Sequence, residues 1–390
     1  MPIVRAKCTN CGANLSVDSL NEAAICQYCD SAFVVEKAIN NYNITNHIQA
    51  NVVNIYENNE RDFEIRGGVL TRYIGESMFV NVPKNIVEIG SGSFEKSRIK
   101  RVIIPMGVET ISYSAFCNCL DLEQIEIPSS VKSIGEWAFA CCEKLGKIVL
   151  PDSVISIGEH AFSNCNRIEK IVLPDSVREI GSGTFSDCVA LRTVSLPNSA
   201  VYLPQSIFSG CVSLTTISLP KNLKGIPENC FKGCSSLKEI AIPPCVYEIG
   251  FRAFWGCTSL ERVNLPEGLN LICRQAFTNC ESLEHIHLST TIKKIEHEAF
   301  SSSSLTAISF PHKEVEVEER AFINCKNLID VHAPRELVQK LTWKFAFIDT
   351  PYYDYLVIQE RKRQGACLSC GSQDFTLFGK CKRCGKKKDY

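Results

Sequence analysis

Eight cysteines in four Cys-x-x-Cys pairs are the residues of this sequence best suited to chemistry. Two pairs lie near each end of the chain: Cys8, Cys11, Cys26, Cys29, Cys367, Cys370, Cys381 and Cys384. Four thiolates from two tight turns can surround a zinc ion tetrahedrally at about 2.3 Å per bond, and such a closed site leaves no open position for catalysis. The spacing therefore predicts two structural Zn²⁺ sites, one within residues 1–36 and one within residues 364–390.

Both cysteine modules resemble zinc ribbons, and the resemblance implies small domains that fold around their metal. A thiol redox enzyme or a zinc-responsive sensor is the alternative, because thioredoxin-like proteins also carry a Cys-x-x-Cys motif. That motif is expected as one pair beside a βαβ unit, whereas each end of this sequence carries two pairs without such a unit. We therefore favour zinc at both ends and keep the redox function as an alternative.

The C-terminal cysteine module is basic, although the whole sequence has a net charge of −1. Its cations surround the second cysteine pair: Lys380, Lys382, Arg383, Lys386, Lys387 and Lys388. Together with Phe375 and Phe378, they can contact phosphates and stacked bases. They can equally offset the negative charge of a four-thiolate zinc centre. The module therefore indicates a structural or protein-docking ribbon, with a nucleic-acid- or ribosome-associated factor as the alternative.

Between the two cysteine modules the sequence is one long internal repeat. A phenylalanine recurs every 22 or 23 residues: Phe94, Phe116, Phe139, Phe162, Phe185, Phe208, Phe231, Phe254, Phe277, Phe300 and Phe322. A unit of this length has room for one short strand, a proline-led turn, a second extended piece and one helical turn, and it cannot bury its apolar side alone. Stacked units align phenylalanine with phenylalanine and join their strands into a parallel sheet, which predicts a repeat solenoid.

The repeat motif resembles a known family. Leu145-x-x-Ile148-x-Leu150-Pro151 is followed by Val154-x-x-Ile157-Gly158-x-x-Ala161-Phe162-x-x-Cys165, and close variants recur from about residue 63 to residue 334. This pattern resembles the BspA-type leucine-rich repeat, a bacterial and protozoal variety. The resemblance implies a curved protein-binding or adhesive scaffold without enzymatic activity.

The predicted fold is a leucine-rich repeat solenoid with short parallel strands on one face, otherwise irregular with helical turns, flanked by two zinc ribbons. Its expected segments are a four-cysteine ribbon at 1–36, an Asn-rich strand linker at 37–56, an entry cap and first unit at 57–93, repeats at 94–334, a helical C-terminal cap at 335–363 and a basic four-cysteine ribbon at 364–390. A hairpin around Gly67-Gly68 is expected to cover the first unit. Leu337, Leu341 and Phe345 are expected to cover the last one.

The Asn-rich segment alternates apolar and polar residues from Tyr42 to Val52, the period of a half-buried strand. A lone strand of this length is not stable by itself. Residues 40–56 therefore predict either a linker that packs locally or a strand that pairs with copies from other chains and forms a homo-oligomer.

The side chains that flank the central apolar residue of each repeat strand point away from the core. The surface predicted to bind a partner comprises Lys147, Lys170, Thr193, Ser195, Thr216, Ser218, Arg262, His285 and His287. Because solenoids often bind partners on their concave face, the leading hypothesis is a scaffold that binds a protein partner there. The alternative is a solvated sheet face without a specific ligand.

The cysteines of the repeats, such as Cys142 and Cys165, are expected to be small buried apolar side chains, with redox sensing as the alternative. The first residues show no apolar run of signal-peptide length, and 22 cysteines without such a signal favour a reducing cytoplasm. No Gly-x-Ser-x-Gly, His-Glu-x-x-His or phosphate-loop motif occurs. We therefore expect a cytoplasmic protein that is not an enzyme.

Overall fold

The computed structural model describes residues 60–340, 343–364, 366–374 and 380–387, together with the backbone of four short strands near the N-terminus. The chain divides into two compact units, Met1–Ile55 and Tyr56–Tyr390. In the first unit, β1 (Ile3–Lys7) pairs antiparallel with β2 (Asn14–Asp18), and β3 (Ala23–Ile25) pairs antiparallel with β4 (Ala32–Val34). The four N-terminal cysteines and the Asn-rich segment lie outside the described residues.

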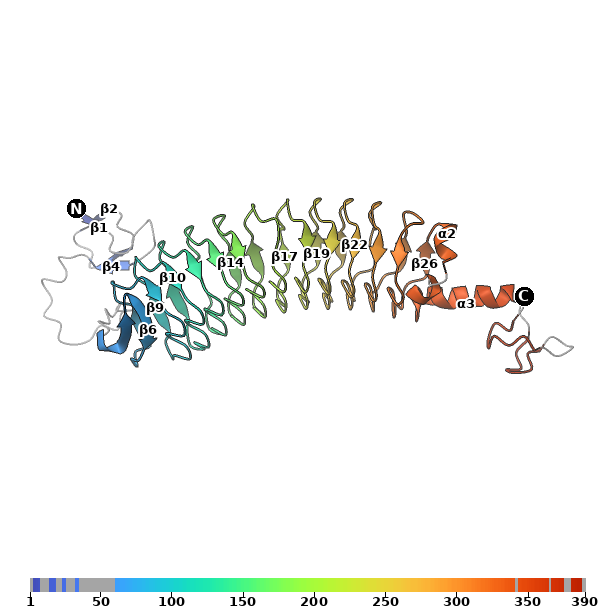
Figure 1. Cartoon of the computed structure of the whole chain (residues 1–390), viewed down its shortest axis with the longest axis horizontal. Helices are drawn as coiled ribbons and strands as arrows, with labels where there is room; N and C mark the ends of the chain where they lie inside the picture. The colour runs from blue at the N-terminus through green and yellow to red at the C-terminus, as the bar shows by residue number, and fades with distance from the viewer. Residues whose placement is uncertain are drawn as a thin grey trace. The chain divides into compact units, whose positions relative to one another are not determined.

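The second unit is a solenoid of parallel strands with about eleven turns, here called coils (Figure 1). Most coils contribute a short strand to a first ladder. These strands are β7 (Phe79–Asn81), β9 (Arg101–Ile103), β11 (Gln124–Glu126), β14 (Lys170–Val172), β16 (Thr193–Ser195), β17 (Thr216–Ile217), β19 (Glu239–Ala241), β21 (Arg262–Asn264), β24 (Ala307–Ser309) and β26 (Asp330–His332). Equivalent residues pair in register, as Gln124 pairs with Arg101 and Thr193 with Lys170, so the coils repeat with the sequence period.

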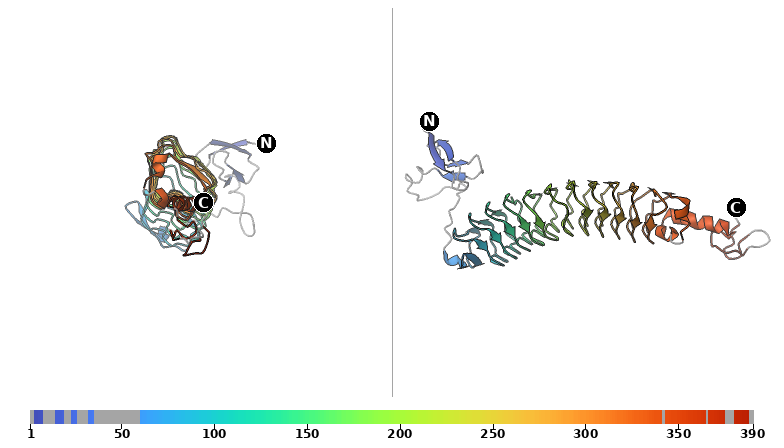
Figure 2. Two further views of the ribbon diagram at one scale, coloured as in Figure 1. Left: turned by 90° about the vertical axis from the view of Figure 1, so that its right-hand side faces the viewer. Right: turned by 45° about the horizontal axis from the view of Figure 1, so that its top comes forward.

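A second ladder is built from the extended piece after the proline-led turn. Its two-residue strands are β8 (Glu88–Ile89), β10 (Thr110–Ile111), β12 (Ser133–Ile134), β13 (Ser156–Ile157), β15 (Glu179–Ile180), β18 (Gly225–Ile226), β20 (Glu248–Ile249), β22 (Leu271–Ile272), β23 (Lys294–Ile295) and β25 (Glu316–Val317). Because both ladders use buried branched side chains in register, every coil shares one core with its two neighbours. The end-on view in Figure 2 shows the coils superimposed around that core.

The predicted hairpin at the start of the solenoid is confirmed. After η1 (Glu60–Asp62), β5 (Phe63–Arg66) and β6 (Val69–Tyr73) pair antiparallel. Gly67 and Gly68 connect them with φ of 57° and 81°, a left-handed backbone that side chains disfavour. β6 then pairs parallel with β8, so the hairpin covers the first edge of the second ladder.

The repeat phenylalanines form a continuous stack, the Phe column, along the interior. From Phe94 to Phe322, successive ring centroids lie between 4.8 Å and 6.1 Å apart, and the rings stay within 17° of parallel. All of these rings are buried. Tyr73 extends the column at its start and Phe347 at its end, with centroid distances of 5.2 Å to Phe94 and 5.1 Å to Phe322.

The segment around each phenylalanine differs from the helical turn expected there. It is a turn with positive φ two residues before and two residues after the phenylalanine, as at His160 (51°) and Asn164 (59°) around Phe162. This backbone points alternate N–H groups at the next coil: Trp137, Phe139 and Cys141 donate to the carbonyls of Glu159, Ala161 and Ser163 at 2.7–2.8 Å. A helical turn would direct those N–H groups along its own axis and leave the coils unlinked here.

The C-terminal cap consists of α2 (Arg335–Val338), η2 (Trp343–Phe347) and α3 (Pro351–Arg363). Leu337 is buried as expected, but the expectation for Phe345 is wrong, because its side chain is 41% exposed. Phe347 covers the last ring instead, since its register in η2 places it on the Phe column. Leu341 lies outside the described residues. Within the described residues, no helix is long and apolar enough to cross a membrane.

The nine cysteines of the repeats are buried, as the sequence predicts, and each has a defined hydrogen bond. Their thiols donate to the carbonyl oxygen of the phenylalanine in the preceding coil at 3.0–3.3 Å, as Cys119 does to Phe94. The S–H groups thus satisfy the carbonyls of the Phe column.

These thiols should resist alkylation in the folded protein. Burial raises the pKa of Cys119 and of Cys188 to about 12, so almost no reactive thiolate exists at pH 8. Cys245 is exposed and should react first among the solenoid cysteines. Mass spectrometry after iodoacetamide treatment should find Cys245 modified and the other two unmodified until denaturant is added. Modification of Cys119 at the rate of Cys245 would contradict the buried placement.

Candidate functional site

The first ladder presents its outward side chains as two exposed rows, here called the strand face. In β11, β14, β16, β19 and β21 the central residue is buried and both flanking residues are exposed. The sequence-predicted partner residues are all exposed on this face, namely Lys147, Lys170, Thr193, Ser195, Thr216, Ser218, Arg262, His285 and His287. The alternation of inward and outward side chains along each strand is therefore sufficient to predict that these residues are exposed.

The strand face is interrupted between β11 and β14. The coil between them is attached by a single bridge from Gln124 to Lys147, and β14 begins a separate sheet. Gly146 stands in this coil at the position that holds Glu123 and Glu169 in the neighbouring coils. A Cβ added to Gly146 would lie 3.8 Å from its nearest neighbour, the Arg167 carbonyl oxygen, so open space remains beside it.

A groove of about 900 Å³ lies at this interruption. Its apolar wall includes Val149 and Val172, which are 65% and 49% exposed. Lys147, Lys170 and Arg167 supply cations along it, and Asp152 and Glu169 supply carboxylates. We call this the valine groove. The valine groove can bury an apolar side chain of a partner and place positive charge beside it.

The two lysines of the valine groove differ from the other cations of the strand face. Arg101 is paired with Glu126, and Arg262 with Glu239 at 3.2 Å. In the described part of the chain, Lys147 and Lys170 have no ion pair. Their charges are available to a partner without first breaking an internal contact.

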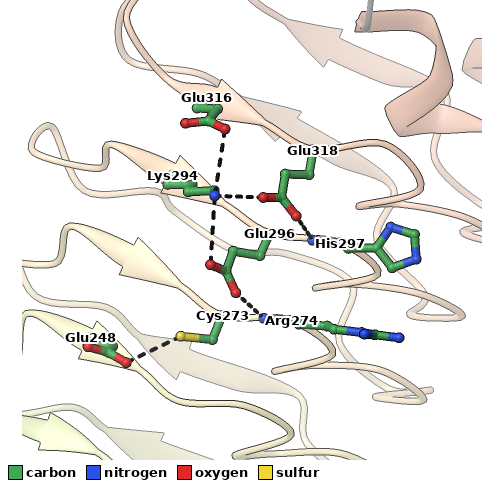
Figure 3. A network of polar contacts seen from close by, with 8 residues as sticks. All are labelled: Glu248, Cys273, Arg274, Lys294, Glu296, His297, Glu316 and Glu318. Carbon is green, nitrogen blue, oxygen red and sulfur yellow. Dashed lines mark hydrogen bonds and ion pairs between the residues drawn. The ribbon is translucent and has the colours of Figure 1, made fainter.

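The second ladder carries a polar network near its C-terminal end (Figure 3). Lys294 lies 2.6 Å from a Glu318 carboxylate oxygen, 3.6 Å from one of Glu316 and 3.8 Å from one of Glu296. The backbone N–H groups of Arg274 and His297 donate to Glu296 and Glu318 at 2.9 Å and 2.8 Å. The hydrogen bond that Lys294 donates to Glu318 raises the pKa of Lys294. Lys294 thus links its own coil to two carboxylates of the next coil, so the network serves to hold neighbouring coils together.

The four C-terminal cysteines are brought together by two matching turns. Gly371 and Gly385 each have φ of 74°, and their N–H groups donate to the carbonyls of Cys367 and Cys381 at 2.7 Å and 2.9 Å. The N–H groups of Cys367 and Cys381 donate in turn to the carbonyls of Ser372 and Lys386, both at 2.8 Å. Two turns of the same geometry therefore face each other.

The thiol geometry of this cluster suits a tetrahedral metal ion. The sulfur atoms of Cys367, Cys370, Cys381 and Cys384 all lie within 4.8 Å of one another, with 3.5 Å between Cys367 and Cys384 and 3.4 Å between Cys370 and Cys381. Four sulfurs at 2.3 Å from zinc are about 3.8 Å apart, which this set matches closely. A hydrogen bond from the Cys384 backbone lowers the pKa of Cys381 to about 6, whereas hydrogen bonds with the other three thiols raise the pKa of Cys384 to about 11, so the four thiols titrate as a set.

A side chain from the C-terminal cap holds the first of these turns. The Arg361 guanidinium Nη1, near the end of α3, donates to the carbonyls of Leu368 and Ser369 at 2.6 Å and 3.3 Å. The basic side chains Lys380, Lys382, Arg383, Lys386 and Lys387 are exposed around the cluster, and Lys388 lies outside the described residues. Of the two predicted metal sites, only this one lies within the described residues.

A family model for the BspA type leucine-rich repeat region matches residues 73–191, 156–280 and 224–349. The chain belongs to the BspA-type leucine-rich repeat family. The matched residues are those of the solenoid, so the resemblance seen in the repeat motif is confirmed, whereas nothing in the family model covers the terminal cysteine modules.

Solved structures of other leucine-rich repeat proteins are similar to this BspA-type solenoid. The T. pallidum leucine-rich repeat protein is 30% identical over 52% of this chain and 90% of its own, with a TM-score of 0.43. A leucine-rich repeat protein from Bacteroides ovatus is 29% identical over 73% of this chain and 94% of its own, with a TM-score of 0.43. A leucine-rich cell surface protein from Faecalibacterium prausnitzii is 24% identical over 72% of this chain and 95% of its own, with a TM-score of 0.45. No curated protein matches the chain.

The sequence does not predict the valine groove itself. Among the residues that line it, Val149, Val172, Gly146 and Arg167 are not in the set predicted to bind a partner. The available signal is Gly146, because a glycine there interrupts a column of charged residues. His285 and His287 are exposed as expected, and the Nδ1 of His285 lies 3.4 Å from the Thr306 hydroxyl.

Proposed function

We propose that this chain is a protein-binding scaffold whose partner occupies the valine groove of the strand face. The partner segment places an apolar side chain between Val149 and Val172 and directs carboxylates at Lys147 and Lys170. The observation that carries the proposal is the coincidence of exposed apolar surface with two unpaired lysines. Leucine-rich repeat proteins generally bind proteins, which supports a binding role and not a catalytic one.

Charge reversal in the groove should reduce partner capture. Lys147→Glu with Lys170→Glu places two carboxylates where the partner presents its own, so capture should fall about tenfold, since rim charges contribute modestly but repulsion adds to their loss. The purified full chain is used as bait in a cell lysate, and each captured protein is quantified by mass spectrometry. The matched control is Lys221→Glu with Lys313→Glu, which changes the net charge equally at exposed positions outside the groove.

The comparison of these two variants decides the proposal. A partner that binds in the valine groove is lost from the groove variant and retained by the control. Equal capture by the wild type and the groove variant would contradict the proposed site. Equal loss in both variants would show that only the net charge matters.

The basic C-terminal module supports a second candidate function, contact with nucleic acid. Lys382, Arg383, Lys386 and Lys387 are exposed around the thiol cluster, where they are available to phosphates. Nucleic-acid binding releases counterions and therefore weakens steeply as the salt concentration rises, whereas capture in the valine groove combines two lysine contacts with an apolar contact and should weaken less. The two functions therefore differ in their response to ionic strength.

We also propose that the chain works in a reducing compartment such as the cytoplasm. The buried thiols of the solenoid act as hydrogen-bond donors to the Phe column, a role that requires them to stay reduced. The buried, hydrogen-bonded thiols support a reducing compartment.

A further inference from the structure

The second ladder has a hollow in its middle that the proposed function does not use. In the coils from residue 112 to residue 181, the residue after the buried isoleucine is small: Ser112, Gly135, Gly158 and Gly181. The residue before the isoleucine is also small at Thr110, Ser133 and Ser156. Where these short side chains line up, a groove of about 1030 Å³ forms.

Proline closes one end of this groove. The N–H groups of Gly158 and Gly181 donate to the carbonyls of the preceding coil at 2.8 Å, but Pro204 stands at the next equivalent position and has no N–H. The second ladder accordingly stops at β15, and the Phe column is widest here, at 6.1 Å between Phe185 and Phe208. Tyr202, 72% exposed, forms the wall at this end.

The charged side chains along the groove are mainly acidic. Glu136, Glu159 and Glu179 line it from three successive coils and are exposed. Among the described residues, none of these three carboxylates has an ion pair or side-chain hydrogen bond. The one cation of the wall, Arg178, is bound through Nη1 to the Asp175 carbonyl at 2.7 Å and the Ser199 hydroxyl at 3.1 Å.

In the coils of Figure 3, the positions equivalent to these small residues hold long charged side chains. There, Lys294, Glu296 and Glu318 occupy the positions beside the buried isoleucine or valine, and their charges pair with one another. In the groove the corresponding positions hold serine, threonine or glycine, except for Glu179, so the carboxylates at its rim have no internal cation as a partner. The same face of the solenoid therefore changes from a surface whose carboxylates share one lysine to an open groove whose three carboxylates have no ion pair among the described residues.

We propose that this acidic groove binds an extended basic peptide segment, separately from the valine groove. Glu136 and Glu159 lie one coil apart in one column, a spacing of about 4.8 Å, and Glu179 lies in the next coil in the column that precedes the isoleucine, so a peptide in the groove meets carboxylates from two columns. Arginine or lysine side chains can thus pair with Glu136, Glu159 and Glu179 in one pass. The face of Tyr202 offers a further cation–π contact at the end of the groove.

Fluorescence anisotropy tests this with a labelled peptide of alternating arginine and serine, about ten residues long. The isosteric triple variant Glu136→Gln, Glu159→Gln and Glu179→Gln should weaken its binding about tenfold at low ionic strength. The control triple variant Glu261→Gln, Glu281→Gln and Glu284→Gln changes the net charge equally at exposed positions elsewhere on the solenoid, and should leave binding within about twofold of the wild type.

A second variant keeps the test independent of the carboxylates. Tyr202→Ser introduces the residue that Ser133 and Ser156 provide in the same column, and it should weaken binding of the same peptide about threefold through loss of the cation–π contact. Absence of binding to the wild type at low ionic strength would overturn the proposal. So would equal weakening in both triple variants, which would indicate attraction by net charge alone. Capture in the valine groove is measured separately, so either proposal can fail while the other stands.

Discussion

Phe231→Ala should lower the free energy of unfolding by about 3–5 kcal/mol, the cost of deleting a large aromatic side chain from a packed core. Phe231 is fully buried, and its ring centroid lies 5.8 Å from that of Phe208 and 5.3 Å from that of Phe254. Alanine removes the contacts with both neighbouring rings and leaves a cavity in the middle of the Phe column. Urea unfolding followed by circular dichroism measures the change.

The matched control for this variant is Thr216→Ala on the strand face. Thr216 is exposed, so its truncation should change the free energy of unfolding by no more than about 0.5 kcal/mol. Small and equal losses from both substitutions would mean that the column does not provide the core of the solenoid. A large loss from Thr216→Ala alone would reverse the assignment of inner and outer sides.

The interior of the solenoid was predictable because one spacing determines it. A period of 22 or 23 residues places each phenylalanine, and each cysteine three residues later, in the same surroundings. The exposure of Lys147 and Thr193 follows from the alternation along a strand. The spacing does not predict which group accepts the thiol hydrogen bonds, because the acceptors are carbonyl oxygens of the preceding coil.

The turn beside the Phe column could not be predicted from local residue types. Trp137, Arg252 and Glu298 all adopt positive φ, although none of them is a residue that favours this conformation. Hydrogen bonds to the next coil select the backbone there, and these exist only once the coils are stacked. The same reasoning explains why Phe347 was missed, since it joins the column 25 residues after Phe322, outside the repeat period.

Both grooves arise where a coil departs from the repeat. Gly146 replaces a charged residue beside the first ladder, and Pro204 replaces a glycine in the second. The two substitutions are visible in the sequence, but their effect depends on which hydrogen bonds the neighbouring coils can still make. A repeat consensus predicts the solenoid, and the exceptions to it determine where a ligand can bind.

Zinc content provides the prediction with the second large effect. If the C-terminal cluster holds zinc, Cys370→Ser with Cys384→Ser should remove one equivalent of zinc per chain, because two of four thiolate ligands are lost from a site whose binding free energy is typically about 10–16 kcal/mol. The wild type should hold two equivalents if the four N-terminal cysteines form the second predicted site. Atomic absorption on protein purified without chelators measures the content. Cys117→Ser with Cys245→Ser is the control, since these two cysteines lie in the solenoid.

The same measurement separates a structural metal from thiol redox chemistry. The two turns of the cluster have matching hydrogen bonds, Arg361 holds one of them, and together they bring the four thiols within 4.8 Å of one another. Zinc would protect them from alkylation until a chelator is added. A redox pair would instead lose free thiols on mild oxidation and bind no metal. The zinc prediction is wrong if the wild type contains no zinc, or if the Cys370→Ser, Cys384→Ser variant contains as much zinc as the wild type. The cluster would then be a redox site or a purely structural thiol site. The solenoid should unfold at the same urea concentration in every case, because no cluster thiol contacts the Phe column.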